Sequence, residues 1–450
     1  MVHFRKKESA QLFQMTWPII LELLITGVIS TGSTYLLNGY SQDAVAVVGS
    51  LSQIVTVTVN LYTVISIGSS VLLAPMVGAG KHREAGKLIQ TVLYSNLLFS
   101  IAVSVIMVCC INSFLGMMQL DRALYPMGRE YLFASLGLSV MQSLLVTYVA
   151  IFRSFGRMKD VLICNFTVYL VCFIVNCIIY FGIPLEKQHI LFYTLAGIIG
   201  QGCGVLYLHA RLNKLFWKKY GRSRLQPGEW SNYLKKVLQF GTLGGLEGIC
   251  YLIIQTFVVS MMGLLGTQAL LVKAYVATFA GYMVLCDNAL VASVFVLTGQ
   301  HLGEKNYEAL RRTNKEGNIA GIVLTAMVGI VLIIFSRSIL LLFTTDPGVI
   351  HQVQVMLYIQ LALEIVRVPV ALLVVELKGV GEVKIPFALT IAGGICNLVL
   401  SWVFGIHLKM GLPGIWIGYF GDLLFRLAVG GYYLKKIFRH PEKYLEKVSL

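Results

Sequence analysis

Residues 317–340 read GNIAGIVLTAMVGIVLIIFSRSIL, and Arg337 is the only charged residue among them. A helix crosses the ~30 Å hydrocarbon core of a bilayer with roughly 20 apolar residues, so this stretch is long enough to span it. Lipid offers no hydrogen-bond partners, and the backbone must pair its own polar groups. The stretch therefore predicts a membrane-spanning helix.

The rest of the chain repeats this pattern. Of 450 residues, 57% are hydrophobic and 13% are charged, with a mean hydropathy of +0.77, which is more apolar surface than a soluble fold of this size buries. The short alternating strands of an outer-membrane barrel are missing. We predict an all-α integral membrane protein with twelve transmembrane helices, at about 11–37, 44–77, 88–115, 127–152, 161–181, 190–210, 232–262, 266–298, 317–340, 351–377, 386–406 and 412–434.

Basic residues predict how the chain is oriented. The two tails, the even-numbered loops and the central connector hold 28 of the 36 Lys and Arg residues, whereas the odd-numbered loops hold 5. Short cytoplasmic loops carry the excess of positive charge, so both termini and the connector are predicted to be cytoplasmic. The first apolar run lacks a small-residue cleavage site and is predicted to be a signal anchor. We expect no nucleic-acid binding, because these basic residues form no single face.

An internal repeat organises the chain. FRSFGRMK (152–159) and LKGVGEVK (377–384) lie 225 residues apart, and the same offset relates SQDAV (41–45) to GTQAL (266–270). Self-similarity at half the chain length indicates a duplication. Six is an even number of spans, so both copies enter the membrane in the same sense. We predict two parallel six-helix lobes related by a pseudo-twofold axis along the membrane normal, at 1–212 and 232–450, with a cytoplasmic linker at 213–231.

Several kinds of chemistry have no recognisable site in this sequence. The nearest approach to a nucleotide-binding loop, GKHREAGK (80–87), has five residues between its glycines and Leu88 in place of Ser or Thr. The nine cysteines fall inside apolar runs without metal or redox spacing and are interpreted as small apolar fillers. We therefore predict that the protein is not an enzyme and has no catalytic residue, metal site or cofactor.

Ionisable residues inside the predicted spans are candidates for function, because charge at membrane depth is costly. Asp422 and Arg426 are four residues apart, and Glu364 and Arg367 are three apart, so each pair can neutralise itself on one helix. Glu22, Glu247 and Asp287 have no basic partner within one turn of their own helices.

These three carboxyl groups lie at similar predicted depths, roughly 16 to 24 Å from the cytoplasmic ends of their spans, and are predicted to share a central cavity. A desolvated carboxyl group can hold a proton near neutral pH, and a hydrated one attracts cations. A neutral, hydrogen-bonded carboxyl that fixes helix packing is the structural alternative for each. Polar and aromatic residues on inner spans are candidates to line the cavity, and interhelical hydrogen bonds are the structural alternative for each of Asn60, Tyr62, Gln142, Asn165, Gln255 and Tyr282.

Five short stretches follow one another along the chain: PIILE (18–22), AVAVVG (44–49), GQHLG (299–303), LKGVG (377–381) with Pro386, and GIWIG (414–418). In this order they resemble the recurring patterns of the multidrug and toxic compound extrusion (MATE) transporters, and the resemblance covers nearly the whole chain. The resemblance implies two six-helix lobes, alternating access and export of drugs in exchange for protons or sodium.

At the positions that are acidic in parts of that family, this chain has Ser33-Thr34 in span one, Tyr251 in span seven and Arg367 in span ten. Asn176 lies where members often have Asp or Asn in span five. It joins Glu22, Glu247, Asp287, Glu364 and Arg367 as a candidate for substrate binding or ion coupling.

These observations predict a multidrug efflux transporter of the cell (inner) membrane, with a role in antibiotic resistance. It would exchange cationic or amphipathic small molecules for H⁺ or Na⁺, contact membrane lipid and act as a monomer. Two alternatives remain open: a flippase for a lipid-linked saccharide, and a channel or intramembrane enzyme.

Overall fold

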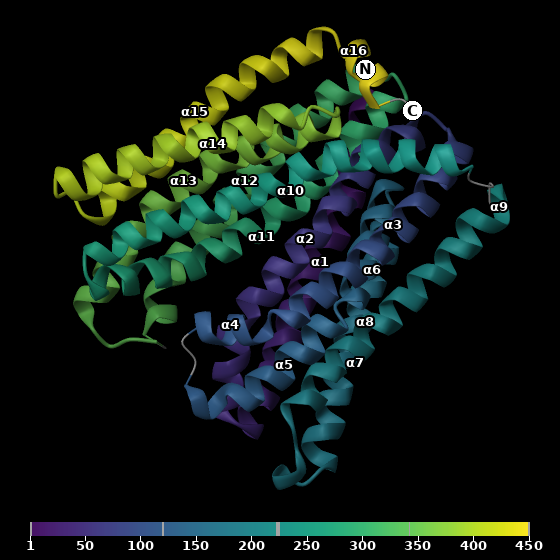
Figure 1. Cartoon of the computed structure of the whole chain (residues 1–450). Helices are drawn as coiled ribbons and strands as arrows, with labels where there is room; N and C mark the ends of the chain where they lie inside the picture. Colours follow the sequence, from purple (N-terminus) through teal and green to yellow (C-terminus); the bar gives the residue numbers. More distant parts are fainter. Residues whose placement is uncertain (1, 119–120, 222–225, 342, 449–450) are drawn as a thin grey trace. The chain divides into compact units, whose positions relative to one another are not determined.

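The protein is almost entirely helical in a computed structural model that describes residues 2–118, 121–221, 226–341 and 343–448, and these residues contain no β-strand (Figure 1). The helices are α1 (Val2–Tyr40), α2 (Gln42–Gly78), α3 (His82–Cys109), α4 (Ile111–Met117), η1 (Arg122–Leu124), α5 (Tyr125–Gly137), α6 (Val140–Ser154), α7 (Met158–Gly182), η2 (Leu185–Lys187), α8 (Ile190–Leu212), η3 (Asn213–Trp217), α9 (Lys218–Tyr220), α10 (Pro227–Leu264), α11 (Thr267–Gly303), α12 (Tyr307–Leu340), α13 (Pro347–Gly379), α14 (Lys384–Leu400), η4 (Ser401–His407), α15 (Leu412–Arg439) and α16 (Glu442–Val448).

The predicted membrane architecture is confirmed. Among the described residues, eleven helices are long and apolar enough to cross a membrane, and the bent pair α5–α6 makes a twelfth span when it is counted as one. The predicted third run, 88–115, is divided between α3 and α4. The predicted linker at 213–231 is largely helical, since η3 and α9 continue α8 and α10 begins at Pro227; residues 222–225 lie outside the described residues.

The fourth span bends by 42° between α5 and α6. A break in a membrane helix leaves carbonyl groups without their usual donors, and neighbouring hydroxyl groups can replace those donors. The Ser104 hydroxyl on α3 donates to the carbonyl oxygens of Leu136 (2.6 Å) and Gly137 (3.0 Å). Ser139 also donates to Leu136, at 2.7 Å. The sequence near Gly137 therefore breaks the helix without leaving these two carbonyls unpaired.

The last two spans approach each other closely through glycine. A Cβ atom on Gly418 of α15 would lie 2.1 Å from the Ser401 hydroxyl, and one on Gly414 would lie 2.6 Å from the backbone of Phe404. These glycines form a GxxxG pattern, which lets two membrane helices pack with their backbones almost in contact. The partner segment η4 is π-helical.

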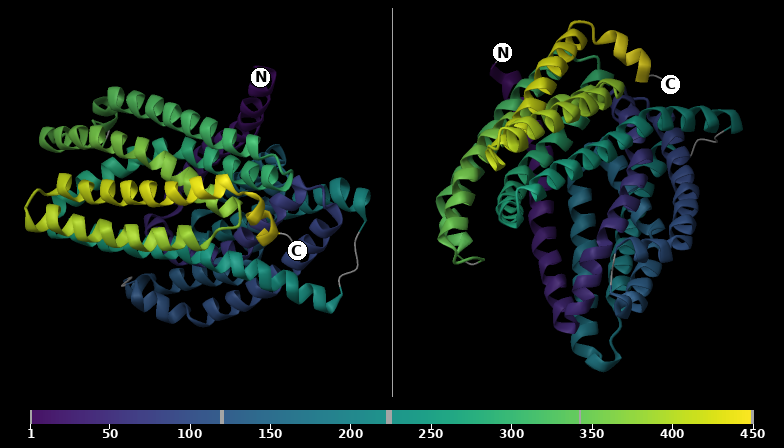
Figure 2. Two further views of the ribbon diagram at one scale, coloured as in Figure 1. Left: turned by 90° about the horizontal axis from the view of Figure 1, so that it is seen from above. Right: turned by 60° about the vertical axis from the view of Figure 1, so that its left-hand side comes forward.

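The described residues form two compact units. The N unit is made of those from Pro18 to Gly245, and the C unit of those before Pro18 and after Gly245. In each unit the long helices run side by side (Figures 1 and 2). The units divide inside α1 and α10, whereas the predicted lobe boundaries at 212 and 232 stay a prediction.

Each unit therefore contains the beginning of a helix whose remainder belongs to the other unit. In the C unit, the Thr16 hydroxyl of α1 donates to Ser293 of α11 at 3.1 Å. In the N unit, Gly241 of α10 lies against α2, where a Cβ atom on Gly68 would meet the Val237 carbonyl oxygen at 2.0 Å. Residues 16 and 241 differ by 225, as do 68 and 293, so the same pair of positions forms both helix crossings.

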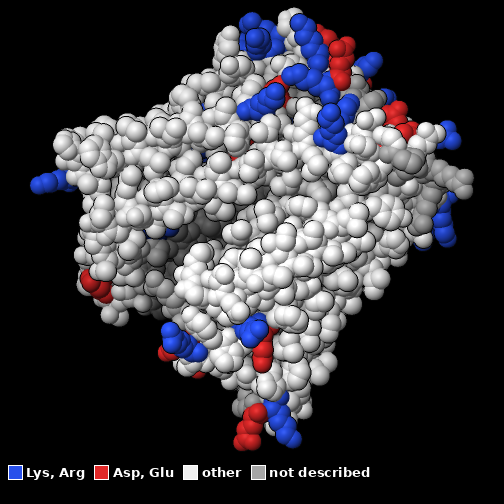
Figure 3. Space-filling view, in the orientation of Figure 1, with Lys and Arg blue, Asp and Glu red and all other residues white. Residues whose placement is uncertain are grey.

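The surface agrees with a lipid environment. Figure 3 shows long stretches of helix surface without a Lys, Arg, Asp or Glu side chain, with charged side chains gathered near the helix ends. Large apolar side chains are exposed on α12, among them Ile334 at 69% and Phe335 at 56%. Apolar groups exposed over whole helices are expected of a protein whose helices cross a membrane.

Candidate functional site

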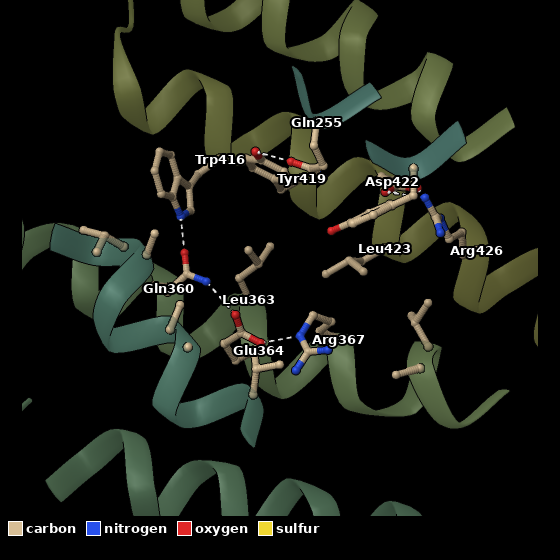
Figure 4. A pocket seen from close by; sticks show the side chains of 18 of the residues that line it. Gln255, Gln360, Leu363, Glu364, Arg367, Trp416, Tyr419, Asp422, Leu423 and Arg426 are labelled. Carbon is tan, nitrogen blue, oxygen red and sulfur yellow. Dashed lines mark hydrogen bonds and ion pairs between the residues drawn. The ribbon is translucent and has the colours of Figure 1, made fainter. Parts of the chain in front are cut away.

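A cavity of about 580 Å³, the C cavity, lies within the C unit and is lined by α10, α11, α13 and α15 (Figure 4). Helical spacing brings its polar side chains to one side of each helix. On α13, Gln360, Glu364 and Arg367 follow one another at intervals of four and three residues, and Tyr419 and Arg426 on α15 are seven apart. Residues at these intervals share one face of a helix.

One hydrogen-bonded chain in this cavity ends on an arginine. The Trp416 indole N–H donates to Gln360 Oε1 at 2.8 Å, and Gln360 Nε2 donates to Glu364 Oε1 at 2.7 Å. Arg367 Nε donates to the other oxygen of Glu364. Arg367 Nη2 also lies 2.9 Å from Asp287 Oδ2, and Asp287 is fully buried on α11. Two carboxyl groups therefore share one guanidinium group.

A second chain lies further along α13 and α15 and includes residues of α10 and α14. Arg426 pairs with Asp422 through two of its nitrogens, the Nη2 to Oδ2 distance being 2.9 Å. Arg426 Nη1 donates to the Thr390 hydroxyl, which donates to Glu247 Oε1, both at 3.2 Å. Lys378 Nζ lies 2.7 Å from Glu247 Oε2. The charges of this chain therefore balance in pairs.

The N unit contains a smaller cavity of about 360 Å³, the N cavity, between α2, α5, α6 and α8. Its polar lining includes Thr58, Ser135, Ser139, Gln142 and Gln201. None of the described residues that line it carries a formal charge. It is therefore a polar but neutral space.

The two cavities occupy equivalent places in the two repeats. Nine of the twelve residues that line the N cavity have a partner exactly one repeat of 225 residues later in the lining of the C cavity, so the cavities are two versions of one feature. The pairs are Val55 and Ala280, Val59 and Val284, Ser135 and Gln360, Ser139 and Glu364, Gln142 and Arg367, Thr194 and Tyr419, Gly197 and Asp422, Ile198 and Leu423, and Gln201 and Arg426.

Comparison with known proteins decides the family. The MatE family model matches residues 18–178 and 245–403, which together cover more than half of the chain. This chain belongs to that family, the MATE transporters. The two separate matches, one in each half, agree with the internal repeat.

Relatives and solved MATE structures extend along nearly the whole chain. "Uncharacterized transporter YisQ" of Bacillus subtilis is 27% identical over 418 residues, covering 92% of this chain and 91% of that protein. "Probable multidrug resistance protein NorM" of Thermotoga maritima is 22% identical over 444 residues, with 92% and 90% covered. The structure of the Vibrio cholerae MATE transporter VcmN has a TM-score of 0.87 at 18% identity, covering 96% of this chain and 98% of that one. Such a likeness shows the fold.

The sequence offered the three acidic candidates of this MATE protein no basic partner on their own helices. Each has a basic partner from another helix, because helix packing brings distant residues together. Glu22 lies 3.1 Å from Arg153 and accepts a hydrogen bond of 2.6 Å from Asn165. Glu247 is paired with Lys378, and Asp287 with Arg367.

The structure places these acids in different surroundings. Glu247 lines the C cavity, and Asp287 lies against Arg367, which lines it. Glu22 belongs to the N unit and lines neither of the two cavities. The local pairs predicted on single helices do form, both between Asp422 and Arg426 and between Glu364 and Arg367.

The other candidates separate into cavity residues and packing residues. Gln142 lines the N cavity, and Gln255 lines the C cavity, where it accepts a hydrogen bond of 2.8 Å from Tyr419. Asn165 binds Glu22, and the Tyr62 hydroxyl lies 2.6 Å from Ser139.

Three further candidates also line neither cavity. Asn176 is buried beside Cys172, Asn60 is half-buried, and Tyr282 is 58% exposed. Whether any of these candidates binds substrate or ion stays a prediction.

Several residues of the site were not predicted from the sequence, among them Gln360, Trp416, Lys378 and Thr390. The repeat offset was a usable signal for two of them. Arg153 and Lys378 differ by 225 residues, as do Asn165 and Thr390, and Glu22 and Glu247. The offset therefore marks these three pairs of positions as equivalent in the two repeats, although it does not show which residues are in contact.

Proposed function

We propose that this MATE transporter exports cationic or amphipathic small molecules by alternating access, in exchange for H⁺ or Na⁺. The observation that carries the proposal is the group formed by Asp287, Glu364 and Arg367 in the C unit, where two carboxyl groups share one guanidinium. One negative charge is left without a counter-charge, and a buried charge of this kind is costly. A proton, a metal cation or the cationic group of a substrate would each compensate it, which supports exchange of one for another.

The division of α1 and α10 between the two units supports alternating access. A helix whose two parts pack in different units would transmit a relative movement of those units, as rocking transport mechanisms require. Pro18 opens the part of α1 that belongs to the N unit, and proline removes a backbone hydrogen bond there. Gly241, Gly244 and Gly245 precede the equivalent division of α10.

We further propose that the protein acts as a monomer in the cell (inner) membrane, with both termini in the cytoplasm. The distribution of Lys and Arg residues supports the orientation. Export at this membrane would confer antibiotic resistance on the cell. No cofactor beyond the exchanged ion is proposed.

Efflux of a fluorescent cationic dye from proteoliposomes, driven by an imposed H⁺ or Na⁺ gradient, tests this proposal. Asp287→Asn and Glu364→Gln should each lower the rate or change which ion drives it, because both residues belong to the cluster around Arg367. The matched control is Asp43→Asn, which neutralises an exposed acid outside both cavities. Unchanged rates and ion dependence in both test variants would remove these residues from coupling, and a wild-type protein that ignores both gradients would contradict the proposed antiport.

A further inference from the structure

The end of α15 carries three neighbouring basic side chains. Lys435, Lys436 and Arg439 lie in its last two turns together with Tyr432, and all four side chains are exposed. Residues three or four positions apart are neighbours on a helix surface, with Cβ atoms about 5–6 Å apart. The four residues therefore form one compact surface, which we call the α15 patch.

The charges of the α15 patch are not neutralised by neighbouring acids. Among the described residues, no carboxyl oxygen lies within 4.0 Å of a side-chain nitrogen of the patch. The next acid along the chain, Glu442, lies 3.4 Å from His440 instead. Another cation approaches this end of the helix, because Arg311 of α12 donates a hydrogen bond to the Phe438 carbonyl oxygen. Three positive charges therefore lack a counter-ion within the described part of the chain.

The other repeat treats the same positions differently. The positions equivalent to the α15 patch lie around the end of α8 and are occupied by Tyr207, Ala210, Arg211 and Lys214. There, Arg211 donates to Asp160 at 2.9 and 2.7 Å, and Tyr207 donates to it at 3.4 Å. The residue of the C unit that is equivalent to Asp160 is Ile385. The repeated fold therefore does not require three free cations at this helix end.

The length of α15 brings the patch to the edge of a membrane. Its 28 residues, Leu412–Arg439, extend over roughly 42 Å. The hydrocarbon core is about 30 Å thick, so the last turns of the helix would reach the lipid headgroups. Leu424 and Ala428 are exposed and precede Tyr432 at intervals of four on the same face. An apolar strip thus leads to a tyrosine, a residue common at the boundary between lipid tails and headgroups, and then to the cations.

We propose that the α15 patch binds the headgroup of an anionic phospholipid. The lipid phosphate would accept hydrogen bonds from Lys436 and Arg439, and Lys435 would add electrostatic attraction. An acyl chain of the same lipid would lie along Leu424 and Ala428. A soluble anion would contact the cations but leave the apolar strip unused, so the arrangement favours a lipid. This inference goes beyond the proposed function and does not depend on which ion or substrate is exchanged.

Native mass spectrometry of the purified full-length protein tests the proposal, because it resolves individual bound lipids. The probes are phosphatidylglycerol, which is anionic, and phosphatidylcholine with the same acyl chains, which is zwitterionic. Titration of each lipid gives the dissociation constant for the first bound molecule. We expect the Kd of the wild-type protein for phosphatidylglycerol to be about tenfold lower than that for phosphatidylcholine.

The decisive variant replaces all three basic residues of the α15 patch with glutamine, and it should reduce the lipid preference to about twofold or less. The matched control, Lys214→Gln with Lys218→Gln and Lys219→Gln, removes three exposed charges near the end of α8 and should keep the preference. A second test copies the acid of the other repeat. Ile385→Asp should lower the preference about threefold by pairing with the patch, whereas Ile385→Asn should leave it unchanged.

Several results would overturn the proposal. Equal losses in the patch variant and its control would mean that any group of cations at the membrane edge suffices, and no loss in either would mean that the patch binds no lipid. A wild-type protein that binds both lipids alike would have the same meaning. If the patch variant does not fold, the two Ile385 variants decide, and equal preferences in both would count against the patch. Displacement of phosphatidylglycerol by an equal concentration of glycerol phosphate, which has no acyl chains, would assign the patch to soluble anions.

Discussion

The N cavity and the C cavity are built at equivalent positions of two repeats, yet one is neutral and the other is charged. Ser139, Gln142 and Gln201 line the first, and Glu364, Arg367 and Arg426 replace them in the second. Apart from α10, the helices that line the C cavity correspond to those that line the N cavity, so the fold itself tolerates either set. The difference indicates that the charges of the C cavity serve a purpose other than holding the helices together.

In a second comparison, of two ion pairs, the two repeats have the same feature. Glu22 with Arg153 and Glu247 with Lys378 are ion pairs at equivalent positions, and both units contain one. A feature present in both repeats is expected of a common structural role. We therefore interpret these pairs as supports that hold α1 and α10 to their units, and the cluster around Arg367 as the part that determines function.

The largest effect should come from making the C cavity partly like the N cavity. Arg367→Gln leaves Asp287 and Glu364 buried without their shared cation, which should lower the free energy of unfolding by about 3–5 kcal/mol. Thermal unfolding in detergent measures the loss. The triple change Asp287→Tyr, Glu364→Ser and Arg367→Gln copies the whole neutral set, and it should recover much of the stability while abolishing dye export. A triple variant that still exports dye at the wild-type rate would contradict the functional interpretation.

The second largest effect concerns the two equivalent helix crossings, α10 against α2 and α1 against α11. Gly68→Ala or Gly241→Ala places a methyl group where the nearest carbonyl oxygen is 2.0 Å away, and the helices must separate. We expect about 2–3 kcal/mol of destabilisation from this overpacking. At the equivalent crossing, Thr16→Ala removes one hydrogen bond to Ser293 and should cost only about 1 kcal/mol. Equal effects at the two crossings would show that glycine is not needed for close approach.

Neutralising the basic residue of each of the two equivalent ion pairs should have a moderate effect on stability. Lys378→Gln and Arg153→Gln each leave a buried acid with only a neutral partner, Thr390 or Asn165, and should lower the unfolding free energy by about 1–2 kcal/mol. The loss should be greater for Lys378, because its side chain is 15% exposed against 29% for Arg153. Unfolding temperatures of the two variants, measured together, test the order.

The smallest effect should follow when the basic residues of the two equivalent ion pairs are exchanged between the repeats. Arg153→Lys and Lys378→Arg keep the charge at both positions, and the expected change is below about 1 kcal/mol. Dye export should remain near the wild-type rate. A strong loss of export in either variant, with stability unchanged, would mean that this pair takes part in transport and is more than a support.

Much of this fold could be predicted from the sequence, because lipid makes a long apolar run such as 317–340 unmistakable. The ion pair between Asp422 and Arg426 was also predictable, since residues four apart on a helix must be neighbours. The partners of Glu22 and Glu247 were not, because a contact between helices depends on how they rotate and pack. The bend near Gly137 was missed for a similar reason, since it is stabilised by Ser104 of another helix.

The sharing of α1 and α10 between the two units has a consequence for dividing the protein. A cut in the 213–231 connector would give two fragments. Each fragment would carry the first part of a long helix, and that part packs in the unit that the other fragment mainly forms. Neither fragment would then contain a complete unit. Functional protein should be recovered only when both fragments are produced in the same cell, so the duplicated halves of this chain are no longer independent folding domains.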